Sequence, residues 1–210
     1  MSFRILCRAC CGCFLHHFSP ASRATEKGLA QEEKDAGFAP LFNGTDLTGW
    51  RFGEESPPKE MPANWQVEEG VIRVTGGGSP HLASAKEYGN FELRLEWRGL
   101  KEKYNSGLFI RSGKKVGANQ INLAYKSEGA FLGGKMQGAK AVGEWQKPAG
   151  ERNACRVLSA GDKLPLWCTG FQAGGETAPP TATGSFGLRG RDPHLGFVSV
   201  SRPGGWARCG

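Results

Sequence analysis

Apolar and polar residues along this chain follow the pattern of short strands separated by turns. The clearest example is segment 91–97, where apolar residues alternate strictly with charged ones. Successive side chains of a β-strand point to opposite faces, so this alternation predicts one face in a core and the other in solvent or a groove. The residues predicted to face the core are Phe91, Leu93, Leu95 and Trp97, and the charged ones are Glu92, Arg94, Glu96 and Arg98.

Further apolar runs predict additional strands. Segments 65–67 and 71–74 flank a short glycine-containing turn and predict a hairpin. Many short strands bounded by turns are typical of a β-sandwich or barrel, and the sequence has no longer repeat of the kind that indicates a solenoid or propeller. We therefore predict an all-β fold. The remaining strands are expected at 107–111, 120–123, 157–158, 164–167, 186–188 and 197–200.

The hairpin near the end of the domain carries two cysteines at matching positions. If Gly161 and Asp162 form a two-residue loop, Cys155 lies opposite Cys168. The Cα atoms of such a non-hydrogen-bonded pair lie about 4.5 Å apart, which is within the range of a disulfide. A cross-strand disulfide in an exported protein and two buried free thiols are both compatible with this arrangement. Pro165 argues against a central position in a sheet, because it has no N–H to donate.

Composition excludes several other folds. The chain has 210 residues with 32 Gly and 12 Pro, a density at which long helices do not persist. These residues follow no fixed period, which excludes collagen, and 39% hydrophobic residues exclude disorder throughout. We divide the chain into a signal-like leader with a polar linker (1–37), a β-sandwich domain (38–203) and a tail (204–210).

Charge is informative mainly at the N-terminus. The formal net charge is +7, but the basic residues are scattered, whereas a nucleic-acid-binding protein concentrates them on one stripe. Arg4, Arg8 and Arg23 lie in a segment without acidic residues, which is typical of a leader. We therefore expect no nucleic-acid partner. We also expect the protein to be exported, to the periplasm or the cell surface. If the leader is not a signal, the alternative is a cytoplasmic protein. No apolar run approaches the roughly 20 residues of a membrane span.

The sequence marks no metal or cofactor site within the domain. His81 and His194 are its only histidines, so a histidine-rich centre is excluded, although a divalent metal in a mixed site with carboxylates stays open. The leader contains residue types that bind zinc, but no second pair follows at zinc-finger spacing, so we favour a leader without metal. The residues in question are Cys7, Cys10, Cys11, Cys13, His16 and His17.

The carboxylates of segment 91–97 do not form a glycosidase pair by themselves. Glu92 and Glu96 share one face of the predicted strand at a separation of roughly 13 Å, whereas glycosidase acid pairs lie about 5 to 9.5 Å apart. A charge ladder with Arg94 and Arg98 is the structural alternative, and each of its pairs would contribute only tenths of a kcal/mol.

Two neighbouring strands carry the side chains that a sugar-binding face needs. A polar turn at 105–107 leads into a strand that ends at Arg111. Parity places Phe109 and Arg111 on one face, and it places two amide side chains on one face of the next strand. Amides and guanidinium groups donate to hydroxyls, and aromatic rings stack on sugars; an ordinary polar surface is the alternative. The candidate substrate-binding residues are Asn105, Ser106, Phe109, Gln120 and Asn122.

Several motifs, in order, resemble the 3-keto-disaccharide hydrolase domain family. The first is Leu-Phe-Asn-Gly-Thr-Asp-Leu-Thr-Gly-Trp at 41–50. The resemblance covers about residues 38–202, and it implies a concanavalin-like jelly-roll sandwich. It also implies hydrolysis of glycosidic bonds in 3-keto sugars, typically by an exported bacterial protein. The other matching segments are 65–72, 76–78, 87–94, 105–111, 143–148 and 161–164.

The family activity implies a chemistry for these residues. A 3-keto group acidifies the neighbouring C2 proton, so elimination of the glycoside followed by hydration becomes feasible, and this needs a base and a group that stabilises an enolate. Under this resemblance we expect Glu96 to be the base and Arg111 the charge stabiliser. Asn105, Gln120 and Asn122 would contact an oligosaccharide or keto-sugar substrate.

The chain also departs from the family pattern. The family usually has Tyr-Glu-x-Gln where this chain has Gly-Ala-Asn-Gln at 117–120, so a carboxylate is missing before Gln120. The late hairpin and the final strand differ as well. The alternative to a keto-glycoside hydrolase is therefore a diverged, non-catalytic carbohydrate-binding module.

Overall fold

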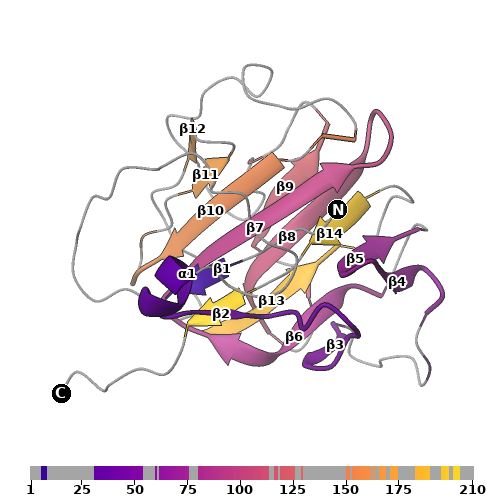
Figure 1. Ribbon diagram of the computed structural model, residues 1–210. Helices are drawn as coiled ribbons and strands as arrows, with labels where there is room; N and C mark the ends of the chain where they lie inside the picture. The colour runs from indigo at the N-terminus through magenta and orange to yellow at the C-terminus, as the bar shows by residue number, and fades with distance from the viewer. Residues whose placement is uncertain are drawn as a thin grey trace.

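The chain forms two antiparallel β-sheets that pack face to face (Figure 1). The computed structural model describes residues 6–8, 31–53, 60, 62–75, 80–113, 116–117, 119–125, 129, 150–151, 153–161, 163, 166–168, 171–174, 183–189, 195–198 and 201–203. Within these ranges helix is confined to the short α1 (Gln31–Asp35). The predicted all-β class is confirmed.

The larger sheet, called sheet A here, is organised around β7 (Phe91–Gly99). Along one edge β7 pairs with β10, and along the other it pairs with β1 and, near its end, with β14. The other strands of sheet A are β10 (Asn153–Ser159), β11 (Leu166–Cys168), β12 (Phe171–Gly174), β1 (Leu6–Arg8), β2 (Phe38–Pro40), β15 (Ser201–Pro203), β14 (Leu195–Val198), β5 (Val71–Val74) and β4 (Trp65–Glu68).

The smaller sheet, called sheet B here, has five strands in the order β3-β6-β13-β8-β9. Its central strand β13 comes from late in the chain, and it lies between two early strands, β6 and β8. This crossover is typical of a jelly-roll rather than of a simple meander. The bounds are β3 (Trp50–Phe52), β6 (Leu82–Tyr88), β13 (Gly184–Leu188), β8 (Asn105–Ser112) and β9 (Gln120–Ala124).

The core lies between the sheets and is built from alternate positions of their strands. In β7 the alternation predicted from the sequence is confirmed, since its four apolar residues are fully buried. The ring of Phe91 meets the ring of Phe186 from sheet B edge-on, with 4.6 Å between centroids. Each fully buried side chain of this size contributes about 1.5–3 kcal/mol to stability, so the sheets are held together mainly by this layer.

The late hairpin has the predicted register. Cys155 lies opposite Cys168, and the pairing continues to a bridge between Ala160 and Lys163 around a two-residue loop. Cys155 is disulfide-bonded and buried in the core. The prediction that β10 and β11 pair at these cysteines is confirmed, and Pro165 lies outside the described residues.

Several strands lack a clear sequence signal, and the prediction missed them. In β6, residues 85–87 are exposed and the pattern does not alternate, because its register shifts opposite β13. The segment Leu6–Arg8, assigned to the leader, pairs with β7 and β2 as β1. The boundary between leader and domain stays a prediction. None of the helices in the described ranges is long and apolar enough to cross a membrane.

Candidate functional site

The predicted site residues do not gather at one place in the sandwich. Glu96 alternates with core residues of β7 and therefore lies on the outer face of sheet A, opposite Ala154 of β10. Gln120 and Asn122 alternate with core residues of β9 and lie on the outer face of sheet B. The core separates the two sets, so the structure does not bring Glu96 together with the predicted sugar contacts.

On sheet B the predicted polar face carries a continuous row of hydrogen-bonded side chains. Arg189, just after β13, donates from Nη1 to Oε1 of Gln120 at 3.2 Å. Gln120 in turn donates from Nε2 to Oδ1 of Asn122 at 3.1 Å. We call these three residues the amide row. Gln120 is buried and the other two are half-buried, so the row is held in place and still reaches the surface.

The start of β8 shapes this row through its glycine. A Cβ at Gly107 would lie 2.5 Å from Nε2 of Gln120, so the Gln120 side chain rests directly on the glycine backbone. The carbonyl oxygen of Gly107 accepts the backbone N–H of Arg189 at 2.9 Å. The hydroxyl of Ser106 donates to the carbonyl oxygen of Arg189 at 2.7 Å. The segment 105–107 therefore positions both ends of the Arg189–Gln120 contact.

Next to the amide row, the outer face of sheet B is covered by a small apolar cluster. Val116, from the loop after β8, packs on Phe109 and Ala83. It sits over Gly187, where a Cβ would lie only 2.6 Å from Cγ1 of Val116. The ring of His81 lies 5.0 Å from the ring of Phe109, measured between centroids. The face thus joins an apolar wall to a polar row.

Two predicted contacts are buried and cannot touch a ligand as they stand. Phe109 is 1% exposed beneath the apolar cluster, so it offers no ring face for a sugar. Ser106 is fully buried and acts on Arg189. Asn105, at the beginning of β8, is half-buried opposite Ala124 and stays a candidate contact.

Arg111 does not lie on this face, and the parity argument fails there. A register shift between Ser185 and Gly187 places an extra residue of β8 opposite β13, and Arg111 has a φ of 45°. A bulge of this kind turns the following side chain away from the alternation. The predicted sharing of a face by Phe109 and Arg111 is therefore wrong.

The guanidinium of Arg111 instead connects turns at the end of the sandwich. It donates to the carbonyl oxygens of Gly161, at 3.0 Å, and Gly89, at 3.3 Å, and contacts Oδ1 of Asn90 at 3.4 Å. Arg111 is only 3% exposed, and desolvation by this burial lowers its pKa below the usual value. These contacts give Arg111 a role in stability and no access to the amide row.

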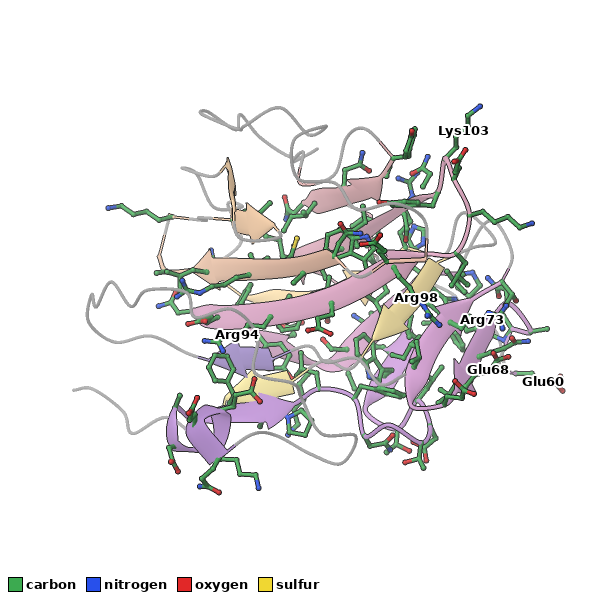
Figure 2. The ribbon with its side chains drawn as sticks, turned by 45° about the horizontal axis from the view of Figure 1, so that its top comes forward. Glu60, Glu68, Arg73, Arg94, Arg98 and Lys103 are labelled. Atoms are coloured by element: carbon green, nitrogen blue, oxygen red, sulfur yellow. The ribbon has the colours of Figure 1, made fainter. Side chains whose placement is uncertain are left out.

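The outer face of sheet A holds an ion-pair network around Glu92. The carboxylate of Glu92 is 1% exposed; it accepts from Nε of Arg156 at 2.9 Å and from Nε of Arg94 at 3.0 Å. Arg94 also lies over the ring of Phe38 at 4.2 Å. Figure 2 shows Arg94 beside β1 and β2, with Arg98 far along β7 near β14. Of the charge ladder named as an alternative, the pair of Glu92 with Arg94 is observed, and Arg156 of β10 joins that pair.

The amide row has no carboxylate beside it on its own strands. Strands β8, β9 and β13 contain neither Asp nor Glu, and position 118, where the family carries an acid, lies outside the described residues. In the part of the chain that the structure describes, no three His, Cys, Asp or Glu residues gather as metal ligands. The remaining candidate ligands Cys10, Cys11, Cys13, His16, His17 and His194 fall in ranges that are not described.

Sequence reasoning missed Arg189 and gave His81 no role. Leu82 of β6 pairs with Leu188 of β13. His81 precedes Leu82 and Arg189 follows Leu188, so these two residues lie at the same end of the two antiparallel strands. Both then share the outer face with Asn122 and Gly107. For this part of the site the sequence offered only the predicted strand at 186–188. Nothing in the local sequence indicates that this strand lies next to β8, which is much earlier in the chain.

Comparison with known proteins identifies the family. Residues 37–198 match the 3-keto-alpha-glucoside-1,2-lyase-like domain, which is more than half of the chain. The chain belongs to this family. A 3-keto-disaccharide hydrolase of Bacteroides thetaiotaomicron is 31% identical over 125 residues, which cover 52% of this chain and 41% of that protein. The match therefore spans less than half of that relative's length.

Solved structures confirm the fold. A protein of Parabacteroides distasonis, provisionally named a glycosyl hydrolase, has a TM-score of 0.64 and 22% identity, covering 82% of this chain and 96% of its own. The β-glucanase of Bacillus licheniformis has a TM-score of 0.53 and 13% identity, covering 78% of this chain and 95% of its own. At these identities the likeness shows the fold alone, and the predicted concanavalin-like jelly-roll is confirmed.

Proposed function

We propose that this domain cleaves the glycosidic bond of 3-keto glycosides, and that it does so on the outer face of sheet B. Membership of a lyase-like family and the named hydrolase relative support the reaction. The observation that carries the location is the amide row, in which three polar side chains are held in a fixed arrangement on that face. Ordered amide and guanidinium groups next to an apolar wall are what sugar recognition requires.

The reaction follows from the chemistry of the ketone. A base removes the proton at C2, and the electrons of the C–H bond form an enolate with the C3 oxygen. The enolate then expels the glycosidic oxygen from C1, which leaves as an alcohol once it is protonated. Water adds across the resulting C1=C2 bond, with its hydroxyl at C1 and its proton at C2. The net result is hydrolysis, and the protein must supply a base and stabilise the enolate.

The geometry changes the assignment of roles. Glu96 and Arg111 were expected to be base and stabiliser, but one lies on sheet A and the other at the end of the sandwich. On sheet B, His81 is the group whose side chain ordinarily exchanges a proton near neutral pH. Arg51 of β3, Glu87 of β6 and Arg189 are charged groups of the described residues that share this face with it. We assign the base to His81.

The experiment measures release of the alcohol from a 3-keto glucoside by the full chain. We expect His81→Gln to lower kcat/KM by about a hundredfold or more, the usual effect of losing a general base. Glu96→Gln is the matched control and should stay within about twofold of wild type. Loss of activity in Glu96→Gln with none in His81→Gln would contradict the placement on sheet B.

The same assay separates the enzyme from the alternative. The absence of Asp and Glu from β8, β9 and β13 is the observation that favours a carbohydrate-binding module. Saturable binding of the keto glucoside by wild type, with no alcohol released even when divalent metal is added, would assign the domain to that alternative class.

A further inference from the structure

Val116, in the segment between β8 and β9, lies over the middle of sheet B. Further along this segment Asn119 lies beside β8, where its carbonyl oxygen accepts the N–H of Ile110 at 3.2 Å. Val116 instead reaches the opposite edge of the sheet, where its N–H donates to the carbonyl oxygen of Gly53, just after β3, at 2.7 Å. Strands β13 and β6 lie between β8 and β3. Val116 is therefore placed across the outer faces of these two strands.

The side chain of Val116 fits into a hollow whose floor is glycine. A Cβ at Gly53 would overlap Cγ2 of Val116, and a Cβ at Gly187 would lie 2.6 Å from Cγ1. Val116 is buried, and it packs with Phe109 and Ala83. A side chain at either glycine would displace Val116, so both glycines are needed for its position.

The contacts of Val116 support His81 in two ways. Gly53, whose carbonyl oxygen accepts the N–H of Val116, donates its own N–H to the carbonyl oxygen of His81 at 2.8 Å. Phe109, on which Val116 packs, has its ring 5.0 Å from the imidazole of His81, measured between centroids. Both the main chain and the ring of His81 therefore lie against groups that Val116 holds in place.

We propose that Val116 is a positioning residue for His81, which it holds where the imidazole can remove the C2 proton of the sugar. The inference rests on the proposed function, in which His81 is the base. A general base acts only within hydrogen-bond reach of the proton that it removes, and a displacement of about 1 Å can cost about a hundredfold in rate. Val116 acts through Phe109 and Gly53, without contact with the substrate.

The first measurement follows the imidazole of His81 by NMR on the full chain, with its resonance identified by its loss in His81→Gln. The nearby ring of Phe109 displaces this resonance from the position of a free histidine. Val116→Ala removes two methyl groups, so the ring of Phe109 can move, and we expect the resonance to move toward that of free histidine. Val67→Ala is the matched control, because it deletes the same atoms from β4 of sheet A.

A second substitution should restore the position of the imidazole. In the double variant Val116→Ala, Gly187→Ala, the new Cβ occupies the space that Cγ1 of Val116 has left. We expect it to return most of the displacement of the His81 resonance. Gly187→Ala alone should disturb the resonance, because its Cβ pushes Val116 away. If Val116→Ala fails to fold, Gly187→Ala carries the test.

The second measurement is cleavage of methyl 3-keto-α-glucoside by the same variants. We expect Val116→Ala to lower kcat by between about tenfold and a hundredfold. KM should stay within about twofold of wild type, because Val116 does not bind the ground state of the substrate. The double variant should recover most of kcat, and Val67→Ala should match wild type in both constants.

The outcomes separate this inference from the proposed function. If the His81 resonance stays in place in Val116→Ala, or if it moves while kcat does not, Val116 is not a positioning residue and the inference is wrong. A double variant with the low kcat of Val116→Ala would also overturn it. In these cases His81→Gln still judges the function. If wild type does not cleave the keto glucoside, the proposed function is wrong and the inference is wrong with it.

Discussion

At the scale of single residues, Arg111 shows how one backbone angle overrides a sequence pattern. Strict alternation along β8 would place its side chain beside Phe109, but a left-handed φ of 45° at the bulge sends it to the turns at Gly89 and Gly161. A non-glycine residue in this conformation is uncommon and costs energy. The three hydrogen-bond acceptors collected by the guanidinium offset that cost, so the residue has a structural role.

This structural role makes a prediction about stability. Arg111→Met removes donors from two turn carbonyls and from Asn90, so we expect the free energy of unfolding to fall by about 2–3 kcal/mol. Urea unfolding measures the loss, and Arg73→Met, whose ion pair with Glu68 is exposed, should change it by no more than about 0.5 kcal/mol. If Arg111→Met instead folds with wild-type stability and no longer binds the keto sugar, the structural role is wrong and Arg111 belongs to the binding site.

At the scale of elements, the sequence predicts what is local and misses what depends on distant pairing. The alternation in β7 and the register of the β10–β11 hairpin follow from neighbouring residues, and both are confirmed. The amide row instead requires β13 to lie beside β8, which a long stretch of chain separates. Neither the position of Arg189 beside Gly107 nor the bulge at Arg111 leaves a local pattern, so that half of the site could not be predicted.

At this scale we predict a disulfide in the β10–β11 hairpin and its effect on stability. Cys155 is disulfide-bonded and its cross-strand neighbour is Cys168, so we predict a bond between these two. A bond closing a loop of this length stabilises by roughly 3 kcal/mol, because it restricts the unfolded chain. The double variant Cys155→Ser, Cys168→Ser should unfold at lower urea than oxidised wild type, and reduced wild type should match it.

Labelling of free thiols is the measurement that would contradict a disulfide in the β10–β11 hairpin. Alkylation of Cys155 by iodoacetamide in native, unreduced protein would rule the bond out. A disulfide forms and persists in oxidising compartments, so a bond recovered from the native host would support the proposal that the protein is exported.

At the scale of the whole molecule, the sandwich has two outer faces with different chemistry. On sheet A the carboxylate of Glu92 is enclosed by two arginines, and this network joins β7 to β10. On sheet B the amide row is bound to itself and to the β8 backbone. The charge of Glu92 is paired within the protein, whereas the outer face of sheet B carries ordered amides and the guanidinium of Arg189, so we expect a sugar to bind on sheet B.

The division between the two faces predicts where a ligand perturbs the protein. On titration with methyl 3-keto-α-glucoside, NMR shifts should change at Gly107, Asn122 and Arg189, while Glu96 and Ala154 on the far side of the core stay within the noise. Gly107→Ala should abolish the changes, because the added Cβ would displace the side chain of Gln120. Gly113→Ala is the control, since a Cβ there meets no atom within 4 Å. Shift changes centred on Glu96 would instead place the sugar on sheet A, and the amide row would then be only a structural feature of sheet B.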